Sequence, residues 1–152
     1  MCGVPEELAM TVKRILDVKG HEVVTASPAT SVAELVKLLA DRRIGAVVVT
    51  GAEGRVVGIV SERDVVVALA RQGASCLGEP VSTIMTREVV SCSEQERIVD
   101  VMRKMTTGRF RHVPVITDHR LAGLISIGDV VKHRVGELEA EAEQLRDYIH
   151  AG

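Results

Sequence analysis

Two stretches of the chain carry the same order of apolar and polar patterns. In the first, a short extended segment at 22–25 precedes a helix to about Arg43, two β-branched runs and a second helix to about Arg71. The runs at 46–50 and 55–60 flank a turn with two glycines and therefore predict a β-hairpin. The buried stripe of the first helix recurs every three or four residues and consists of Val32, Leu35, Val36 and Leu39.

The second stretch repeats this order 65 or 66 residues later. An extended segment at 88–91 precedes a helix, the runs at 112–116 and 121–125 predict a second hairpin, and Ser126 begins the last helix. The buried stripe of the helix that follows segment 88–91 consists of Ile98, Val101, Met102 and Met105. Because the register holds through strand, helix and strand, the sequence predicts a duplicated unit.

Serine and acidic residues mark the expected helix starts. Ser31 with Glu34, and Ser93 with Glu96, have the spacing of a capping box ahead of the two apolar stripes. A further amphipathic helix is expected over Pro5–Leu16, with proline tolerated in its first turn. Its apolar face consists of Leu8, Val12, Ile15 and Leu16.

The predicted fold class is α/β, with two β-α-β-β-α units in a pseudo-two-fold arrangement. Such a small unit cannot cover both faces of its own sheet, so the two sheets are expected to pack together, between an N-terminal and a long C-terminal helix. This packing leaves two equivalent clefts between the copies. The expected segments are a lead-in helix (1–18), a first unit (19–73), a connector (74–83), a second unit (84–136) and a helical extension (137–152).

Composition narrows the functional classes. With 46% hydrophobic residues but only Phe110 and Tyr148 as aromatics, the core is expected to be aliphatic. A net charge of −2 and the lack of aromatic stacking platforms argue against nucleic-acid binding. Cys2, Cys76 and Cys92 form no CxxC motif, which favours reduced thiols and a cytoplasmic location. We expect no membrane association, because no apolar run is long enough to span a bilayer and no signal peptide is evident.

One motif occurs in both copies, at 58–64 and 123–129: glycine, two aliphatic residues, serine, two variable residues and aspartate. Its aspartates, Asp64 and Asp129, fall in the first turn of a helix, where a carboxylate can cap the helix. The alternative is a ligand site, because such a carboxylate can accept hydrogen bonds from both hydroxyls of a ribose. Beside it, Ser61 or Ser126 could donate to a phosphate, and the motif glycines could let a ligand approach the backbone closely.

In the second copy, Arg109, Arg111 and His112 stand at the entry to the first hairpin strand. If Phe110 between them is buried, both arginines project away from the core and could clamp a phosphate. The alternative is a solvated basic edge that discourages strand pairing. His112 is as compatible with a structural hydrogen bond as with a phosphate contact, and no second histidine stands at metal-ligand spacing.

The first copy is less cationic at the matching positions. Arg43 corresponds to Arg109, but Gly45 and Ala46 replace Arg111 and His112. Its cleft is therefore expected to be roomier and to accept an uncharged or longer ligand, such as the second half of a dinucleotide. Arg63 could reach a neighbouring phosphate or simply face water.

The last helix carries apolar residues at alternating steps of four and three, a heptad seam. They are Val131, Val135, Leu138, Ala142, Leu145 and Ile149. The seam could pack on a partner subunit, or it could cover its own domain and pack on the lead-in helix. Gly136 in mid-helix costs about 1 kcal/mol relative to alanine.

The chain resembles a tandem pair of cystathionine-β-synthase (CBS) domains, a Bateman module, from about Thr11 to Glu139. The resemblance is carried by the motifs at 58–64 and 123–129, by Arg-Ile-Gly-Ala-Val-Val-Val from Arg43, and by Arg-Phe-Arg-His-Val-Pro-Val from Arg109. It implies a small stand-alone prokaryotic pair that binds adenosine nucleotides, most often AMP and ATP and in some members NAD, and that dimerises into a flat disc.

By that resemblance Asp64 and Asp129 would hold ribose, and Ser61 and Ser126 would contact phosphate. Adenine would be framed by backbone and strand starts at Val23, Val24, Thr25, Ala46, Val89, Val90, Ser91, Val113 and Pro114.

The expected function is a non-catalytic sensor that binds AMP, or ADP or ATP, in the second cleft, with NAD as a candidate in the first. The expected partners are a second copy in a homodimer and a regulated protein that the sequence does not identify. An enzyme acting on the nucleotide is the alternative, but no activated nucleophile, metal constellation or partnered general base supports it. A ligand-free adaptor that binds through the last helix is the third interpretation.

Overall fold

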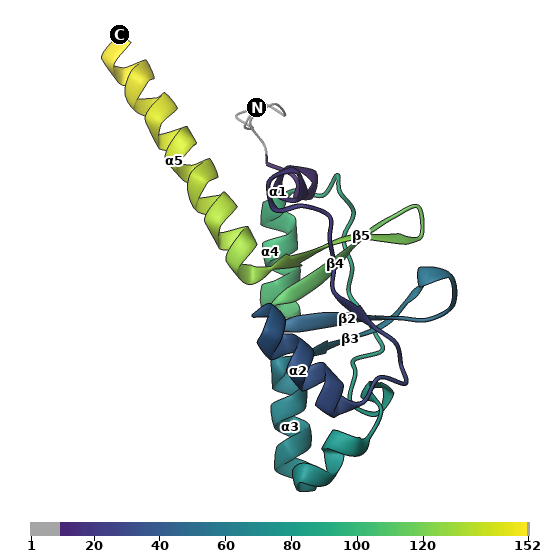
Figure 1. Cartoon of the computed structure of the whole chain (residues 1–152). Coiled ribbons are helices and arrows are strands. Elements are labelled where there is room, and N and C mark those ends of the chain that lie inside the picture. The colour runs from purple at the N-terminus through teal and green to yellow at the C-terminus, as the bar shows by residue number, and fades with distance from the viewer. Residues whose placement is uncertain (1–9, 152) are drawn as a thin grey trace. The chain divides into compact units, whose positions relative to one another are not determined.

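The computed structural model describes residues 10–151 and has the α/β class and the repeated element order that the sequence predicts (Figure 1). The helices are α1 (Val12–Lys19), α2 (Val32–Arg42), α3 (Glu62–Gln72), α4 (Ile98–Gly108) and α5 (Ile127–Ala151). The strands are β1 (Thr25–Ala26), β2 (Ala46–Thr50), β3 (Val56–Ser61), β4 (His112–Thr117) and β5 (Arg120–Ser126). Short 3₁₀ turns occur at Ala52–Gly54, Gly73–Gly78 and Val81–Thr83.

These elements group into two compact units. The first-repeat unit contains residues 22–90 and 116–122, and the second-repeat unit contains residues 10–21, 91–115 and 123–151. Helix α1 therefore belongs with the second repeat rather than with the repeat that it precedes. It ends at Lys19, three residues beyond the predicted end, while Pro5 and Leu8 of the predicted helix lie outside the described residues.

The first-repeat unit is built on a three-stranded sheet in the order β1-β2-β3. Strand β1 pairs parallel with β2, and β2 pairs antiparallel with β3, which confirms the predicted hairpin. Side chains on both faces of β2 are inaccessible to solvent, Val47 and Val49 on one face and Val48 on the other. This double burial explains why the strand reads as an uninterrupted apolar run. Helix α2 covers the sheet with its stripe residues Val32 and Leu35, which are also fully buried.

In the second repeat the hairpin β4–β5 forms as predicted, but the strand expected at 88–91 does not. One parallel bridge, Cys92 to Val115, remains, with the Cys92 amide donating to the Pro114 carbonyl at 3.0 Å. Proline occupies the position of Val48 in the first repeat and has no N–H to donate to the neighbouring strand. The ladder therefore loses its next bond, and the prediction of this strand was wrong for that reason.

The predicted capping box at the start of α2 is confirmed, because Glu34 N donates to Ser31 Oγ and Ser31 N donates to the Glu34 carboxylate. The corresponding prediction for α4 was wrong. Ser93 N does donate to Glu96 Oε2 at 2.6 Å, but this bond closes a turn ahead of the helix. The N-cap of α4 is Arg97, whose side chain makes no capping hydrogen bond.

Backbone from a segment distant in sequence accepts a hydrogen bond from the first amide of each of these helices. Ile98 N donates to Met10 O at 3.1 Å in the second-repeat unit, and Val32 N donates to Glu79 O at 2.9 Å in the first-repeat unit. Single antiparallel bridges, Thr11 to Arg97 and Ser31 to Pro80, accompany these bonds. Each unit is thus completed by the segment that precedes the other repeat.

Those two segments also explain the motif glycines. A Cβ on Gly123 would lie 2.5 Å from a methyl carbon of Leu16, and a Cβ on Gly58 would lie 2.6 Å from the sulfur of Met85. Leu16 and Met85 hold matching places in the two segments and are buried. The interpretation that these glycines admit a ligand was therefore wrong, because a core side chain fills the space at each of them.

We predict that Gly123→Ala destabilises the fold by about 1–3 kcal/mol, because the added methyl group overpacks the contact with Leu16. Urea unfolding followed by circular dichroism measures the change. Gly136→Ala is the matched control: nothing lies within 4 Å of the added Cβ, so it should leave stability unchanged or raise it by up to about 1 kcal/mol. Equal stabilities for the two variants would contradict this account of Gly123.

Candidate functional site

The second-repeat unit places Ser126 at the end of β5 and Asp129 in the first turn of α5. Asp129 Oδ2 accepts hydrogen bonds from the backbone N and the Oγ of Ser126, both at 2.9 Å, and Asp129 N donates to Ser126 Oγ at 3.2 Å. This is the arrangement of a capping box, so the carboxylate is held in place by its own helix start.

The first-repeat unit repeats this geometry at Ser61 and Asp64. Asp64 Oδ2 accepts from Ser61 N at 2.8 Å and from Ser61 Oγ at 3.1 Å, and Asp64 N returns a bond to Ser61 Oγ at 3.4 Å. The capping interpretation is confirmed here. In both units the serine of the cap bonds the carboxylate through Oδ2, as does Lys19 in the second-repeat unit. These bonds do not use Oδ1, which can accept from a ligand.

Lys19, which the sequence did not single out, is bonded to Asp129. Its ammonium lies 2.7 Å from Asp129 Oδ2 and 2.8 Å from the Leu124 carbonyl oxygen. Burial by itself raises the pKa of Asp129, but the hydrogen bonds from Lys19 and Ser126 outweigh it and hold that pKa below its ordinary value. No local pattern links positions 19 and 129, since the contact is made by the tertiary packing of α1 in this unit.

This ion pair predicts an acid-dependent loss of stability. A carboxyl whose pKa is lower in the folded state stabilises the fold above its unfolded pKa, and that contribution is lost as the pH falls through the folded pKa. Lys19→Met should therefore raise the pKa of Asp129 and reduce the stability that the protein loses as the pH falls. A carbon-13 NMR titration of the Asp129 carboxyl group measures this pKa. Lys13→Met, which removes an exposed lysine of the same helix, is the control. Identical Asp129 titrations in the two variants would contradict the assignment.

The backbone just before each hairpin lies directly beside the start of the helix that carries the aspartate, α5 in the second-repeat unit and α3 in the first-repeat unit. Ile127 N donates to Arg111 O at 2.8 Å, and Glu62 N donates to Gly45 O at 3.0 Å in the other unit. The structure therefore brings the Arg111 region to the Ser126 end of α5, and Gly45 to the Ser61 end of α3. Ala46 pairs directly with Ser61 across β2 and β3.

The arginines before β4 are accessible to solvent. Arg109 and Arg111 are exposed and make no ion pair with a described residue, whereas Phe110 is half-buried. The ring of Phe110 lies against Gly108, where an added Cβ would overlap a ring carbon. Two unpaired guanidinium groups at this edge are compatible with a phosphate clamp and with a solvated edge alike. His112 is half-buried at the start of β4.

Arg43 and Arg109 both end a helix in the left-handed conformation, with φ of 53° and 58°. Glycine is the usual residue at such a position, and a side chain there costs roughly 1 kcal/mol. Both repeats have an arginine at this position, although glycine would avoid the strain. This favours a functional role for both arginines.

The predicted adenine frame is only partly assembled within each unit. In the second-repeat unit, the bond from Cys92 N to Pro114 O holds Ser91 beside the buried residues Val113 and Pro114. In the first-repeat unit, Thr25 pairs with Val48 of β2. The remaining members of the frame, Val23, Val24, Val89 and Val90, also belong to the first-repeat unit and are half-buried, except that Val90 is exposed.

Cys92 lies in this region without forming a reactive centre. Burial and the nearby charge of Glu96 raise its pKa to about 12, against an opposing effect of Lys104. The Lys104 ammonium is bonded to Glu96 Oε1 and to the Ser91 carbonyl oxygen, at 2.5 and 3.1 Å. The thiol is therefore protonated at neutral pH and is a poor nucleophile.

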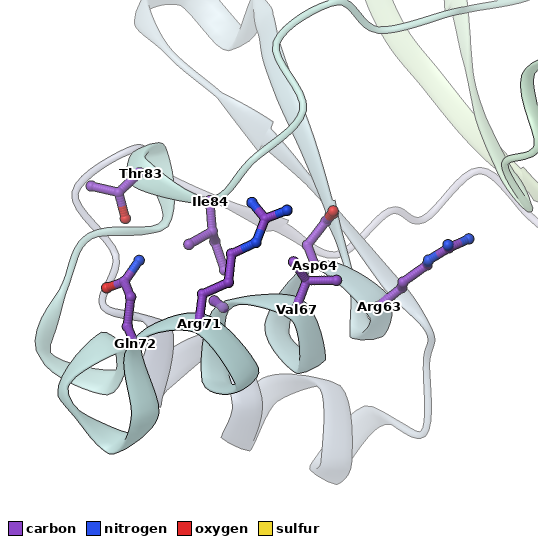
Figure 2. Close-up of a pocket in the computed structure, with 8 residues that line it drawn as sticks. Arg63, Asp64, Val67, Arg71, Gln72, Thr83 and Ile84 are labelled. Atoms are coloured by element: carbon purple, nitrogen blue, oxygen red, sulfur yellow. The ribbon is translucent and has the colours of Figure 1, made fainter.

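A cavity of about 270 Å³ opens beside α3 in the first-repeat unit (Figure 2). It is lined by Arg63, Asp64, Val67, Ala68, Arg71, Gln72, Thr83 and Ile84. Figure 2 shows Asp64 and Arg71 extending from the same side of the helix, while Arg63 points away from Arg71. Arg71 and Thr83 were not predicted; the helical spacing of Asp64, Val67 and Arg71 along one face is the signal that could have found Arg71.

Residues 10–151 contain no group of three or more His, Cys, Asp or Glu side chains placed to hold a metal ion. No helix in that range combines the length and the apolar character that crossing a membrane requires.

Comparison with known proteins gives a consistent result. A model of the CBS domain family matches residues 14–71 and 81–136. The curated protein "CBS domain-containing protein CBSX3, mitochondrial" of Arabidopsis thaliana is 36% identical over 126 residues. This match covers 80% of the chain but only 61% of that relative's length.

Solved structures of CBS-domain proteins are similar to this chain as well. The CBS-domain-containing protein ATU1752 from Agrobacterium tumefaciens is 53% identical, with a TM-score of 0.80, over 82% of this chain and 99% of that one. The CBS domain pair of protein MJ0100, solved with 5′-methylthioadenosine and S-adenosyl-L-methionine, is 28% identical, with a TM-score of 0.76, over 85% and 98% of the two chains. CBS domain protein PAE2072 from Pyrobaculum aerophilum, solved with AMP, is 26% identical, with a TM-score of 0.71, over 79% and 89%.

Proposed function

The chain belongs to the CBS domain family, and on that premise we propose that it is a regulatory module that binds an adenosine-containing ligand without transforming it. One observation carries the proposal: each repeat presents an aspartate that its helix cap fixes through Oδ2, without using Oδ1. A fixed acceptor of this kind suits the hydroxyl groups of a ribose. Two related domain pairs hold adenosine compounds, which supports the same class of ligand here.

AMP, ADP or ATP is the ligand that we propose for the site carried by Asp129. Ser126, Arg109, Arg111 and His112 stand at that helix start or at the entry to β4 and supply donors for a phosphate. For the site carried by Asp64 we propose a larger or less charged ligand, with NAD as one candidate, because Gly45 and Ala46 leave more room and less charge there.

We further propose that the protein works in the cytoplasm as a homodimer and passes the ligand signal to a regulated protein. The thiols of Cys76 and Cys92 are free and buried, which fits a reducing compartment. Catalysis finds no support in the residues around either aspartate, since Lys19 and the serines engage the carboxylates as structural partners.

Asp129→Asn should weaken AMP binding by about 1.5–3 kcal/mol, because an amide replaces the charged acceptor for ribose hydroxyls while keeping its shape. Isothermal calorimetry with AMP, ADP, ATP and NAD measures the affinities. Exposed Asp41→Asn on α2 is the control and should bind like the unaltered protein. Absence of heat with every nucleotide would favour an adaptor, and conversion of a nucleotide to product would favour an enzyme.

Arg111→Ala should weaken binding of AMP more than binding of adenosine, because only AMP carries the phosphate that the guanidinium would contact. The same titration measures both ligands. A matched control is Arg120→Ala, which removes an exposed arginine of β5. An equal loss for AMP and adenosine would remove Arg111 from the phosphate site.

A further inference from the structure

Helix α5 carries an apolar seam that its own unit does not cover. Exposed fractions are 47% for Val135 and Leu138, 61% for Leu145 and 64% for Ile149. The face that packs inward is a different one, where Val130 and Glu137 are buried and the Glu137 carboxylate accepts a bond from Met10 N. The interpretation that the seam covers its own domain was therefore wrong.

We propose that the seam pairs with α5 of a second copy as a parallel, two-stranded coiled coil. The inference deepens the proposed homodimer and rests on that self-association, but not on ligand binding. It names both the surface and its orientation, and two features of the helix carry it.

The first feature is the kind of residue at each seam position. Heptad positions a are Val135, Ala142 and Ile149, and positions d are Val131, Leu138 and Leu145. Two of the three a residues are β-branched and two of the three d residues are leucine, a combination that favours two-stranded parallel coiled coils because these shapes fill the holes of a dimer.

The second feature is the charge beside the seam. In a parallel pair each position g faces position e of the partner five residues further along. This places Arg134 opposite the partner's Glu139, and Glu141 opposite the partner's Arg146, so both contacts join opposite charges. Arg134 also bonds Glu137 of its own helix through Nη1.

The antiparallel register that overlaps the whole seam brings like charges together. With Val135 set opposite the partner's Leu145, positions e face e and positions g face g. Glu139 then meets the partner's Glu139, Glu141 meets the partner's Glu141, and Lys132 meets the partner's Arg146. Like charges at these positions disfavour that register. An antiparallel register shifted by one heptad joins opposite charges but leaves part of the seam unpaired, so the seam as a whole and its charges together favour the parallel orientation.

The helix is also formed before it pairs. α5 is continuous through Gly136, and its first turns are anchored by Val130 and Glu137. Association therefore avoids the cost of nucleating a helix, which limits short isolated coiled coils. Gly136 falls at position b, away from the seam, where its lack of a side chain does not affect the contact.

Cysteine cross-linking tests the orientation. In a Cys2→Ala background, Ile149→Cys places two thiols at one a layer of a parallel dimer, about 6 Å apart between Cα atoms and within disulfide range. In the antiparallel register Ile149 faces the partner's Val131, so the two thiols lie about 27 Å apart along the axis. Asp147→Cys, on the outer face of the helix, is the matched control. Oxidised glutathione should cross-link Ile149→Cys at least about tenfold faster than Asp147→Cys.

A charge exchange gives an independent readout in protein that folds normally, since Glu141 is only half-buried and Arg146 is exposed. Glu141→Arg should weaken the dimer at least about fivefold by light scattering, and Glu141→Arg with Arg146→Glu should restore it. A monomer would overturn the inference together with the proposed homodimer. A stable dimer that fails to cross-link through Ile149→Cys would overturn only this inference, and nucleotide calorimetry reports on ligand binding separately.

Discussion

Helices α3 and α5 each begin with a hydrogen-bonded pair, a serine that ends a partly buried strand and an aspartate three residues later. The pair satisfies amide groups that a helix start otherwise leaves without partners, and it places a negative charge where the helix dipole favours one. Capping occupies only Oδ2 of Asp64 and Asp129. Structural and ligand-binding roles are therefore compatible in one side chain, because the cap engages Oδ2 and so orients Oδ1, the oxygen that a ribose would use.

The two repeats share this cap but differ in the charges around it. Asp129 is bonded to Lys19, and the exposed arginines before β4 belong to the same unit. Asp64 has no such lysine among the described residues and instead lines a cavity with Arg63 and Arg71. Both repeats keep the serine–aspartate cap, which the helix start requires. The charged residues around the cap, which the helix start does not require, differ between the repeats. Two sites with unequal ligand preference are the expected consequence.

Much of the fold was predictable from local patterns. The repeat register, both hairpins and the capping box of α2 depend on residues close in sequence, and the structure confirms them. The errors arose where distant segments decide. Pro114 removes a bond from a strand predicted at 88–91, Met10 takes over the start of α4, and Leu16 fills the space at Gly123.

The candidate site was predictable to the same extent. Ser61, Asp64, Ser126 and Asp129 follow from a short motif, but the bond from Lys19 to Asp129 joins residues 110 positions apart and leaves no periodic trace. This contact could not be predicted because the segment at 10–21, which precedes the first repeat, packs in the unit of the second repeat and brings α1 there.

The central claim is that the open oxygen of a capping aspartate accepts bonds from the hydroxyls of a ribose. Comparing the affinities of AMP and 2′-deoxy-AMP by calorimetry tests it most directly. The account predicts that 2′-deoxy-AMP binds at least about tenfold more weakly, the scale of one lost hydrogen bond to a charged group. Equal affinities for the two sugars would contradict it.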